Sequence, residues 1–252
     1  MAEHTYVILD PSGVEGSFEE TLKVTARFNV KLLEKPERKG FSSVVNYAYL
    51  NVINNRYDAM VLMNNDVEIT TPFVDVAIKL FDELPRLTVI GALLLYPTGK
   101  IQAAGFEVMA PGTVKEYDKN SSFGIHGGDY SKARYVPGVT AAFQIIRSVP
   151  FFKMGLYNPH YKMGFEDVEF CYRCWARGGH VLYTPAITAI HLESATRGKV
   201  PSTWEVESYS TFASQSADWA VKEVKEKVDT LNRQLDNLRK TTTQEHSSQV
   251  QI

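Results

Sequence analysis

The first 97 residues alternate between short apolar runs and segments with helical periodicity. The apolar runs predict strands at 5–10, 29–34, 57–63 and 87–96, and the periodic segments predict helices at 17–28, 41–54 and 72–84. Strands that alternate with helices of roughly 10–15 residues are typical of βαβ units. The pattern therefore predicts an α/β fold with a mostly parallel sheet flanked by helices.

The pattern changes after Pro97. Short alternating segments with glycines predict a hairpin near 98–113, and 110–133 is predicted to be a long irregular loop. Buried strands are predicted at 139–147 and within 180–192. Between them, 165–179 has a helical pattern that begins at Glu166 and Asp167 and ends at paired glycines.

A different repeat runs through the C-terminal region. Apolar residues alternate by four and three positions at Ala217, Val221, Val224, Val228, Leu231, Leu235 and Leu238. This heptad seam predicts a coiled-coil oligomerisation helix over 213–240 that would make the protein a homo-oligomer. The alternative is a long helix folded back on its own domain. Residues 241–252 have little to bury and are predicted to be disordered.

Composition narrows the function classes. The chain has 252 residues, 22% of them charged, with a formal net charge of −2, which argues against bulk attraction to nucleic acid or an anionic membrane surface. No stretch approaches the ~20 apolar residues that span a bilayer, and the start shows no secretory signal pattern, so a cytoplasmic location is expected. Cys171 and Cys174 resemble a metal motif, but without a second pair they are predicted to be buried thiols.

Polar residues stand where several predicted strands end and where a late helix begins. They are Asp10, Asn65 with Asp66, Glu166 with Asp167, and His191. Open α/β sheets bind ligands at the carboxyl ends of their strands, so these side chains are expected to converge. Carboxylates and a histidine can hold a divalent ion that neutralises a diphosphate. Each feature alone also has a structural explanation, as a turn, a helix-dipole complement or a structural histidine.

The ordered segments resemble the family-two glycosyltransferases of the GT-A type, especially the rhamnosyltransferase-like branch. The resemblance runs from about residue 6 to residue 196 and rests on RKGFSSVVNYAY, YDAMVLMNNDVEI, VIGALLLYPTGKIQAAG, VTAAFQIIR, YKMGFEDVEFCYRCWARGGHVLYTP and AIHLESAT. It implies a GT-A domain over 1–205, with a nucleotide-sugar-binding half (1–97) and an acceptor and catalytic half (98–205).

The resemblance also implies a role for individual residues. Asp66 and His191 would hold Mn²⁺ or Mg²⁺, and Asp167 would be the catalytic base, with Glu166 as its neighbour or alternative. The helix N-terminus is expected to lower the pKa of that base and keep it ionised. The nucleotide-sugar donor would meet Asp10, Arg38 or Lys39, Asn65 and Asp66.

The implied reaction is an inverting transfer of a hexose from a nucleoside-diphosphate sugar to an acceptor hydroxyl on a glycan or another molecule. UDP-hexose is the favoured donor and dTDP-rhamnose the next. Relatives normally begin with another strand and helix before the segment matched by YVILDPSG, and Met1 lies only a few residues before it. This departure favours an alternative, a catalytically degenerate GT-A fold that acts as an oligomeric sugar-binding or assembly module. The joint presence of Asp66, Asp167 and His191 favours the enzyme.

Overall fold

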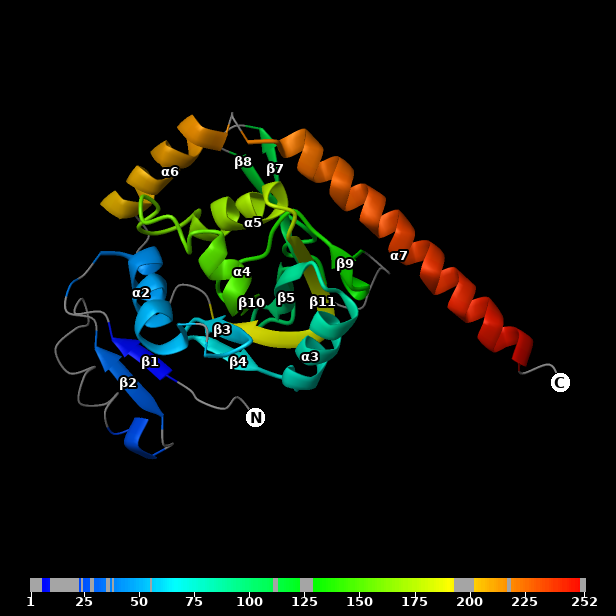
Figure 1. Ribbon diagram of the computed structural model, residues 1–252, viewed down its shortest axis with the longest axis horizontal. Helices are drawn as coiled ribbons and strands as arrows, with labels where there is room; N and C mark the ends of the chain where they lie inside the picture. Colours follow the sequence, from blue (N-terminus) through cyan, green and yellow to red (C-terminus); the bar gives the residue numbers. More distant parts are fainter. Residues whose placement is uncertain are drawn as a thin grey trace.

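The computed structural model has a mixed α/β architecture, with helices packed around a twisted central sheet (Figure 1). It describes residues 6–9, 23, 25–27, 30–34, 37, 39–54, 56–110, 113–122, 129–192, 202–216 and 219–249.

The main sheet has seven strands. Its order is β3 (Ala59–Met63), β10 (Phe143–Arg147), β5 (Leu87–Leu95), β11 (His180–His191) and β4 (Val67–Ile69), with β6 (Ile101–Ala103) beside β5 and β9 (Arg134–Tyr135) beside β11. The expectation of a mostly parallel sheet was wrong, because β11 and β5 are its one parallel pair among the described strands. An apolar run such as that of β10 shows that a strand is buried but carries no information about its direction.

Strand directions determine which ends share an edge of the sheet. Strand β10 is antiparallel to both β3 and β5, and β11 is parallel to β5. Strands β3, β5 and β11 therefore point the same way, and their carboxyl ends lie at one edge. Strand β10 begins at that edge, where Phe143 pairs with Met63.

Strand β5 forms the centre of the core. Its sequence, LTVIGALLL, is buried over all but its last residue. Gly91 lies in the middle of this strand, and a Cβ atom there would come within 2.4 Å of Val139 Cγ1. The glycine is therefore required by the close approach of the loop that precedes β10.

Two smaller sheets flank the main one. Strands β1 (Tyr6–Leu9) and β2 (Lys31–Glu34) form a parallel pair in a separate two-stranded sheet. Strands β7 (Phe106–Ala110) and β8 (Thr113–Glu116) form an antiparallel hairpin that overlaps the second half of the hairpin predicted near 98–113. The next strand after β5 in the chain is β6, which pairs with β5 antiparallel within the main sheet.

The helices cover the sheet and connect its strands. They are α2 (Phe41–Ala48), which continues into the π-helix η1 (Tyr49–Ile53), α3 (Val74–Glu83), α4 (Ser148–Lys153), α5 (Glu166–Ala176), α6 (Thr203–Gln215) and the short 3₁₀-helix η2 (Asp129–Ser131). Helix α3 begins at Val74, two residues after the predicted start at 72. The Thr71 hydroxyl before it accepts a hydrogen bond from the N–H of Thr188 (2.8 Å). Cys171 and Cys174 are buried free thiols within α5.

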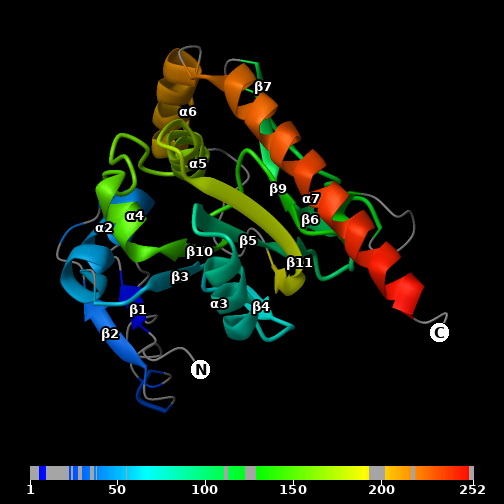
Figure 2. The same cartoon turned by 45° about the vertical axis from the view of Figure 1, so that its right-hand side comes forward.

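The C-terminal helix α7 (Val221–Gln249) lies against its own domain with its first half, and it extends beyond the body of the molecule (Figures 1 and 2). Val224 and Val228 are buried there, and Asn232 exchanges two hydrogen bonds with the backbone of Tyr135, at 2.8 and 2.9 Å. Two valines of the predicted heptad seam are therefore buried within the chain, as expected for a long helix folded back on its own domain. A coiled coil is not shown.

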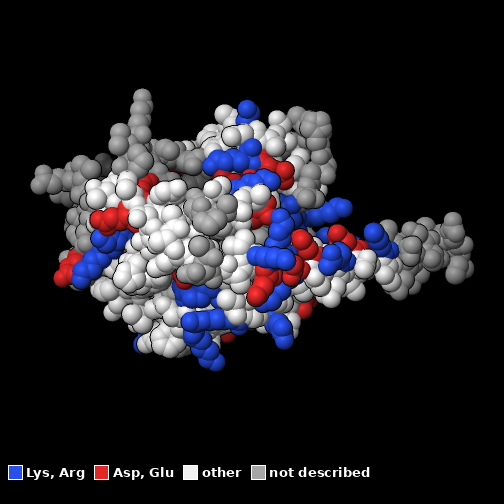
Figure 3. Space-filling model, turned by 90° about the horizontal axis from the view of Figure 1, so that it is seen from above, with Lys and Arg blue, Asp and Glu red and all other residues white. Residues whose placement is uncertain are grey.

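The second half of α7 is more exposed. Leu238 is 67% exposed, and Figure 3 shows acidic and basic side chains interspersed along the projecting helix. Helical structure continues to Gln249, past residue 240, where the sequence pattern predicted that order would end. Among the helices that the structure describes, none has the length and apolarity needed to cross a lipid bilayer.

Candidate functional site

Asp66 and His191 meet at the carboxyl edge of the sheet. Asp66 lies in the turn between β3 and β4, and His191 ends β11. Because β4 pairs with β11 in a register that places Val67 opposite His191, the turn is held beside the histidine. The Nε2 atom of His191 lies 3.1 Å from Oδ1 of Asp66, and both side chains are largely buried. The structure thus brings together the two residues predicted to hold a metal.

A third residue, Gln102 on β6, lies behind the histidine. Its Oε1 atom is 2.6 Å from Nδ1 of His191, and its amide nitrogen donates to the backbone carbonyl of the same histidine at 3.3 Å. An oxygen facing Nδ1 requires that this nitrogen carry a proton. The other ring nitrogen, Nε2, faces Asp66.

This arrangement fits a divalent cation. Ligating histidines usually donate their second ring N–H to an oxygen acceptor, which is the contact that Gln102 supplies. Two ligands each about 2.1 Å from one ion and at a right angle are about 3.0 Å apart, close to the observed 3.1 Å. The described part of the chain holds no group of three or more His, Cys, Asp or Glu side chains suited to a metal. Two protein ligands suit an ion that substrate phosphates help to bind.

Backbone contacts connect this pair to the start of α5. The N–H of Asn64 donates to the carbonyl of Ala142 (3.0 Å), and the side-chain nitrogen of Asn64 is 3.5 Å from Nε2 of His191. The neighbouring N–H of Ala141 donates to Oδ2 of Asp167 at 2.9 Å. The 141–142 loop thus contacts Asp167 directly and, through Asn64, the segment that leads to Asp66.

Asp167 is held by the backbone on both oxygens. In addition to the Ala141 contact, its Oδ1 accepts from the N–H of Val168 at 2.8 Å. Burial nevertheless raises the pKa of Asp167, because desolvation outweighs these hydrogen bonds. The expectation that the helix N-terminus would lower this pKa was wrong for that reason. Glu166, its neighbour, is buried, with 7% of its surface exposed.

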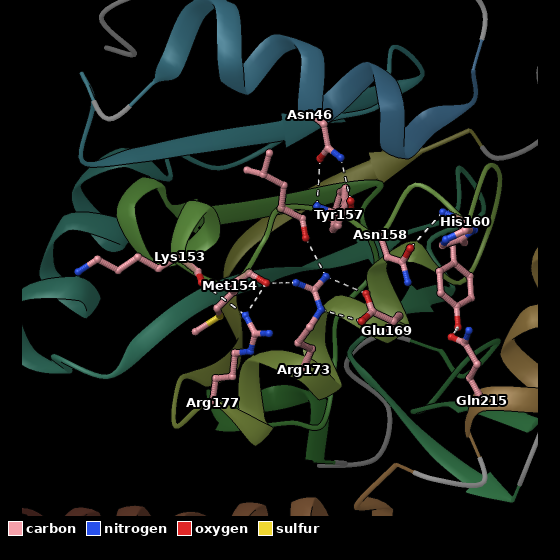
Figure 4. A network of polar contacts seen from close by, with 12 residues as sticks. Asn46, Lys153, Met154, Tyr157, Asn158, His160, Glu169, Arg173, Arg177 and Gln215 are labelled. Atoms are coloured by element: carbon pink, nitrogen blue, oxygen red, sulfur yellow. Dashed lines mark hydrogen bonds and ion pairs between the residues drawn. The ribbon is translucent and has the colours of Figure 1, made fainter.

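A polar network anchors α5 to the segment before it (Figure 4). Arg173 forms a two-pronged ion pair with Glu169, at 2.7 and 2.8 Å, and donates to the carbonyls of Met154 and Leu156. Asn46 of α2 holds the backbone of Tyr157 through both its N–H and its carbonyl. The helix that carries Asp167 is thereby fixed to both α2 and the 154–157 segment.

The turn into α5 packs against α6. Phe165 has a left-handed backbone conformation (φ 68°) directly before Glu166, and its ring stacks on Phe212 at 4.5 Å between centroids. The N–H of Met163 donates to the hydroxyl of Ser208 (3.2 Å). Helix α6 therefore supports the approach to the two acidic residues.

The remaining predicted residues are distributed differently. Asn65 is exposed in the same turn as Asp66. Lys39 forms an exposed ion pair with Glu37 just before α2. Asp10 and Arg38 lie outside the described residues.

The sequence prediction assigned no role to Gln102. The available signal was a glutamine between Ile101 and Ala103 in a segment quoted for the family resemblance. All three residues of β6 are buried, and a buried amide requires hydrogen-bond partners. Nothing in the sequence pattern showed that the partner would be His191.

Comparisons with known proteins bear on this architecture. No protein-family model matches the sequence. An uncharacterised protein, y4gI of Sinorhizobium fredii, is 31% identical over 160 residues, which cover 61% of this chain and 18% of that protein. The O-antigen biosynthesis protein RfbC of Myxococcus xanthus is 29% identical over 153 residues, covering 56% of this chain and 11% of RfbC. The chain thus spans less than a fifth of either curated relative.

Solved structures define the fold class. The mixed sheet with flanking helices is the fold of GT-A-type glycosyltransferases. The crystal structure of GalNAc-T7 with UDP, GalNAc and Mn²⁺ superposes with a TM-score of 0.64 at 16% identity, covering 84% of this chain and 42% of GalNAc-T7.

Proposed function

We propose that this chain is an inverting, divalent-metal-dependent glycosyltransferase that moves a hexose from a nucleoside-diphosphate sugar to an acceptor hydroxyl. One observation carries the proposal. His191 and Asp66 meet at 3.1 Å on a sheet edge whose adjoining 141–142 loop also holds Asp167. An ion ligand pair and a general base at one edge are the two groups that this reaction needs.

The donor is proposed to be a UDP-hexose, with dTDP-rhamnose as the next candidate. The GalNAc-T7 structure contains UDP and Mn²⁺, and the name of RfbC places that relative in O-antigen biosynthesis. These names support a sugar-nucleotide donor, a sugar-containing acceptor and Mn²⁺, with Mg²⁺ as the other candidate ion.

Asp66 and His191 are the proposed metal ligands. When bound there, the ion would neutralise the charge that develops on the departing nucleoside diphosphate. The chain itself holds a carboxylate oxygen and an imidazole nitrogen side by side, and both side chains are largely shielded from solvent. Asn65, exposed in the same turn, is proposed to approach the ribose of the donor.

The rest of the proposed donor site comes from the first part of the chain. Asp10 is proposed to meet the base of the nucleotide, and Arg38 or Lys39 to approach its phosphates. Lys39 lies immediately before α2, where the N–H of Phe41 donates to the carbonyl of Lys162 (2.7 Å). This contact connects the loop that carries Lys39 to the segment that leads into α5.

Asp167 is the proposed general base. It would take the proton from the acceptor hydroxyl as that oxygen attacks the anomeric carbon from the face opposite the leaving group. A single displacement of this kind inverts the configuration of the anomeric carbon. Burial raises the pKa of Asp167, which makes its carboxylate a better proton acceptor once ionised. The two backbone N–H donors keep its oxygens oriented throughout.

The test is release of nucleoside diphosphate by the purified chain from a panel of UDP-, GDP- and dTDP-sugars. Each donor is incubated with Mn²⁺ or with EDTA, and slow donor hydrolysis makes the assay independent of the acceptor. Asp66→Ala is the site variant, and Asp82→Ala, at an exposed aspartate on α3, is its matched control.

Metal-dependent release from one donor is expected in the wild type and in Asp82→Ala and is expected to be lost in Asp66→Ala. If no donor were hydrolysed and no nucleotide were bound, the proposed glycosyltransferase activity would be refuted. That result would instead agree with the degenerate sugar-binding or assembly module.

A further inference from the structure

We propose that Asn232 of helix α7 is a positioning residue, which holds the edge strand β9 and through it the segment that presents the backbone N–H of Ala141 to Asp167. The proposal rests on the proposed function for its catalytic meaning, because Asp167 is the proposed base. The contacts that carry it belong to the folded chain alone. It gives the C-terminal helix, which lies beyond the segments quoted for the family resemblance, a part in the reaction.

Strand β9 turns the backbone groups of Tyr135 away from the main sheet. The N–H of Val136 donates to the carbonyl of Val181 at 3.1 Å, so these two residues form a hydrogen-bonded pair between β9 and β11. In antiparallel strands such pairs alternate with pairs that exchange no hydrogen bonds. The N–H and C=O of Tyr135 therefore point away from β11. Tyr135 is 6% exposed, so these two groups need partners within the protein.

Asn232 supplies both partners from α7, which runs alongside β9 (Figure 2). Its Oδ1 atom accepts from the N–H of Tyr135 at 2.8 Å, and its Nδ2 atom donates to the C=O of Tyr135 at 2.9 Å. A backbone N–H can only donate and a carbonyl can only accept, so these contacts fix the orientation of the amide. Arg239, seven residues further along α7, donates to the carbonyl of Ala133. The helix thus takes the place of a neighbouring strand at this edge.

The packing of α7 before Asn232 holds that side chain in place. Val224 and Val228 are buried, and Asn232 continues their spacing of four residues, so all three lie on one face of the helix. The Nζ atom of Lys225 lies 3.3 Å from Oε2 of Glu107 on β7. The asparagine is therefore presented by the docked part of the helix and not by its projecting end.

The segment that Asn232 holds meets α5 at both of its ends. The ring of Tyr135 packs edge-on against that of Trp175, with centroids 6.4 Å apart, and the indole N–H of Trp175 donates to the carbonyl of Val136 at 3.1 Å. At the other end of the segment, the N–H of Ala141 donates to Oδ2 of Asp167 at 2.9 Å. Trp175 lies in the last turn of α5 and Asp167 in the first. A displacement of Tyr135 therefore reaches the proposed base through the segment and through α5.

The experiment uses the full chain labelled with ¹⁵N and measures hydrogen exchange of individual backbone amides by NMR. Steady-state kinetics with the donor that the wild type hydrolyses and calorimetry with Mn²⁺ alone complete the comparison. Asn232→Leu removes both amide contacts at similar size. Asn232→Ser is a milder variant, because one hydroxyl cannot take the place of both amide groups. Asn237→Leu is the matched control, since Asn237 is an exposed asparagine on the same helix.

In Asn232→Leu the amides of Tyr135 and Ala141 are expected to exchange faster than in the wild type by about tenfold, the order expected when a buried backbone group loses its partner. The amide of Ile145, in the central strand β10, is expected to keep its wild-type rate. The kcat is expected to fall by about 10- to 100-fold with KM unchanged, as when a catalytic group is displaced from a distance. Affinity for Mn²⁺ is expected to be unchanged, and Asn237→Leu is expected to match the wild type throughout.

Unchanged exchange at Ala141 in the Asn232 variants would overturn the proposal, because the contact at β9 would then not reach the base. A loss of Mn²⁺ affinity as large as the loss of kcat would also overturn it, as would an equal effect of Asn237→Leu, since a general loosening would explain both. If Asn232→Leu does not fold, Asn232→Ser gives the same comparisons.

Failure of the proposed function gives a different result. A wild type that hydrolyses no sugar nucleotide, together with faster exchange at Ala141 in Asn232→Leu, keeps the positioning role and refutes the proposed glycosyltransferase activity.

Discussion

The two acidic positions at the carboxyl edge of the sheet are held in different ways. Asp66 meets the side chain of His191, which is oriented by the side chain of Gln102. Asp167 is held by the backbone N–H groups of Ala141 and Val168. A carboxylate held by the backbone depends on the fold, whereas one held through side chains depends on the identity of each partner. The proposed metal binding and the proposed base catalysis should therefore fail separately.

The sharpest test of that separation is Asp167→Asn, which retains size but removes the proton acceptor. Donor turnover is expected to fall by about 10³-fold, within the range usual for a general base. Affinity for Mn²⁺ is expected to stay at the wild-type value, because Asp66 and His191 are untouched. Steady-state kinetics and calorimetry measure the two quantities.

Glu166→Gln is the matched variant for the base, since Glu166 is the adjacent acid on the same helix turn. It is expected to lose less than about tenfold in turnover, well below the loss from a missing base. The reverse ranking of the two variants would assign the base to Glu166.

Asp66→Asn tests the proposed metal-binding position. The substitution removes the charge at the ligand pair, so Mn²⁺ affinity is expected to fall by more than about 100-fold, beyond the loss typical of an outer-shell partner. Isothermal titration with Mn²⁺ alone measures this change. A variant that binds Mn²⁺ like the wild type while losing turnover would show that Asp66 acts on the donor and not on the ion.

Arg173→Met perturbs the support of α5 and leaves the sheet edge intact. Removing one partner of a largely buried ion pair typically costs about 3 kcal/mol of unfolding free energy, and Glu169 would lose both of its contacts to Arg173. Arg177→Met, at an exposed neighbour that donates to the same Met154 carbonyl at 2.7 Å, is expected to cost less than about 1 kcal/mol.

Urea unfolding measures both arginine variants. Turnover is expected to fall in Arg173→Met with unchanged Mn²⁺ affinity, since the network holds Asp167 and not Asp66. Parallel losses of turnover and metal affinity would mean that the two positions are not independent.

The smallest expected effect is a pH dependence of stability from Asp167. Because its pKa is raised in the folded state, the protonated form is favoured by folding. The contribution is fully present below the unfolded pKa of about 3.9 and is lost as the pH rises through the folded pKa. A tenfold difference in proton affinity between the folded and unfolded states corresponds to about 1.4 kcal/mol of unfolding free energy.

The difference in unfolding free energy between the wild type and Asp167→Asn isolates this contribution, because other titrating groups are common to both. The wild type is expected to lose stability relative to the variant as the pH increases from about 3.5 to 7. A constant difference over that range would show that burial does not raise the Asp167 pKa.

Much of the fold followed from local patterns in the sequence. Apolar runs located β3 and β11, and a helical pattern between an acidic pair and two glycines located α5. The expected meeting of Asp66 and His191 followed from the rule that parallel strands end at a common edge. The positions of the elements depend on residues that are close in the sequence, and the meeting of Asp66 with His191 follows from where two strands end.

Other features depend on contacts between distant residues and could not be predicted. The antiparallel entry of β10 between β3 and β5 is set by the path of the preceding chain. The spacing of apolar residues in α7 identified an apolar face, and Val224 and Val228 of that face are buried within this chain. Spacing alone does not show whether such a face packs on its own domain or on a second chain. The role of Gln102 likewise depends on a residue 89 positions away.

Gly91 places a limit on the evolution of this chain. A glycine within a strand usually lowers stability by roughly 0.5–1 kcal/mol, yet here its missing methyl group is the space that Val139 occupies. Val139 lies two residues before Ala141, whose N–H meets Asp167. Substitutions at an exposed turn residue such as Asn65 can accumulate without disturbing the core. At position 91, adding a single methyl group would displace Val139, and that displacement would reach the proposed base, Asp167, through Ala141.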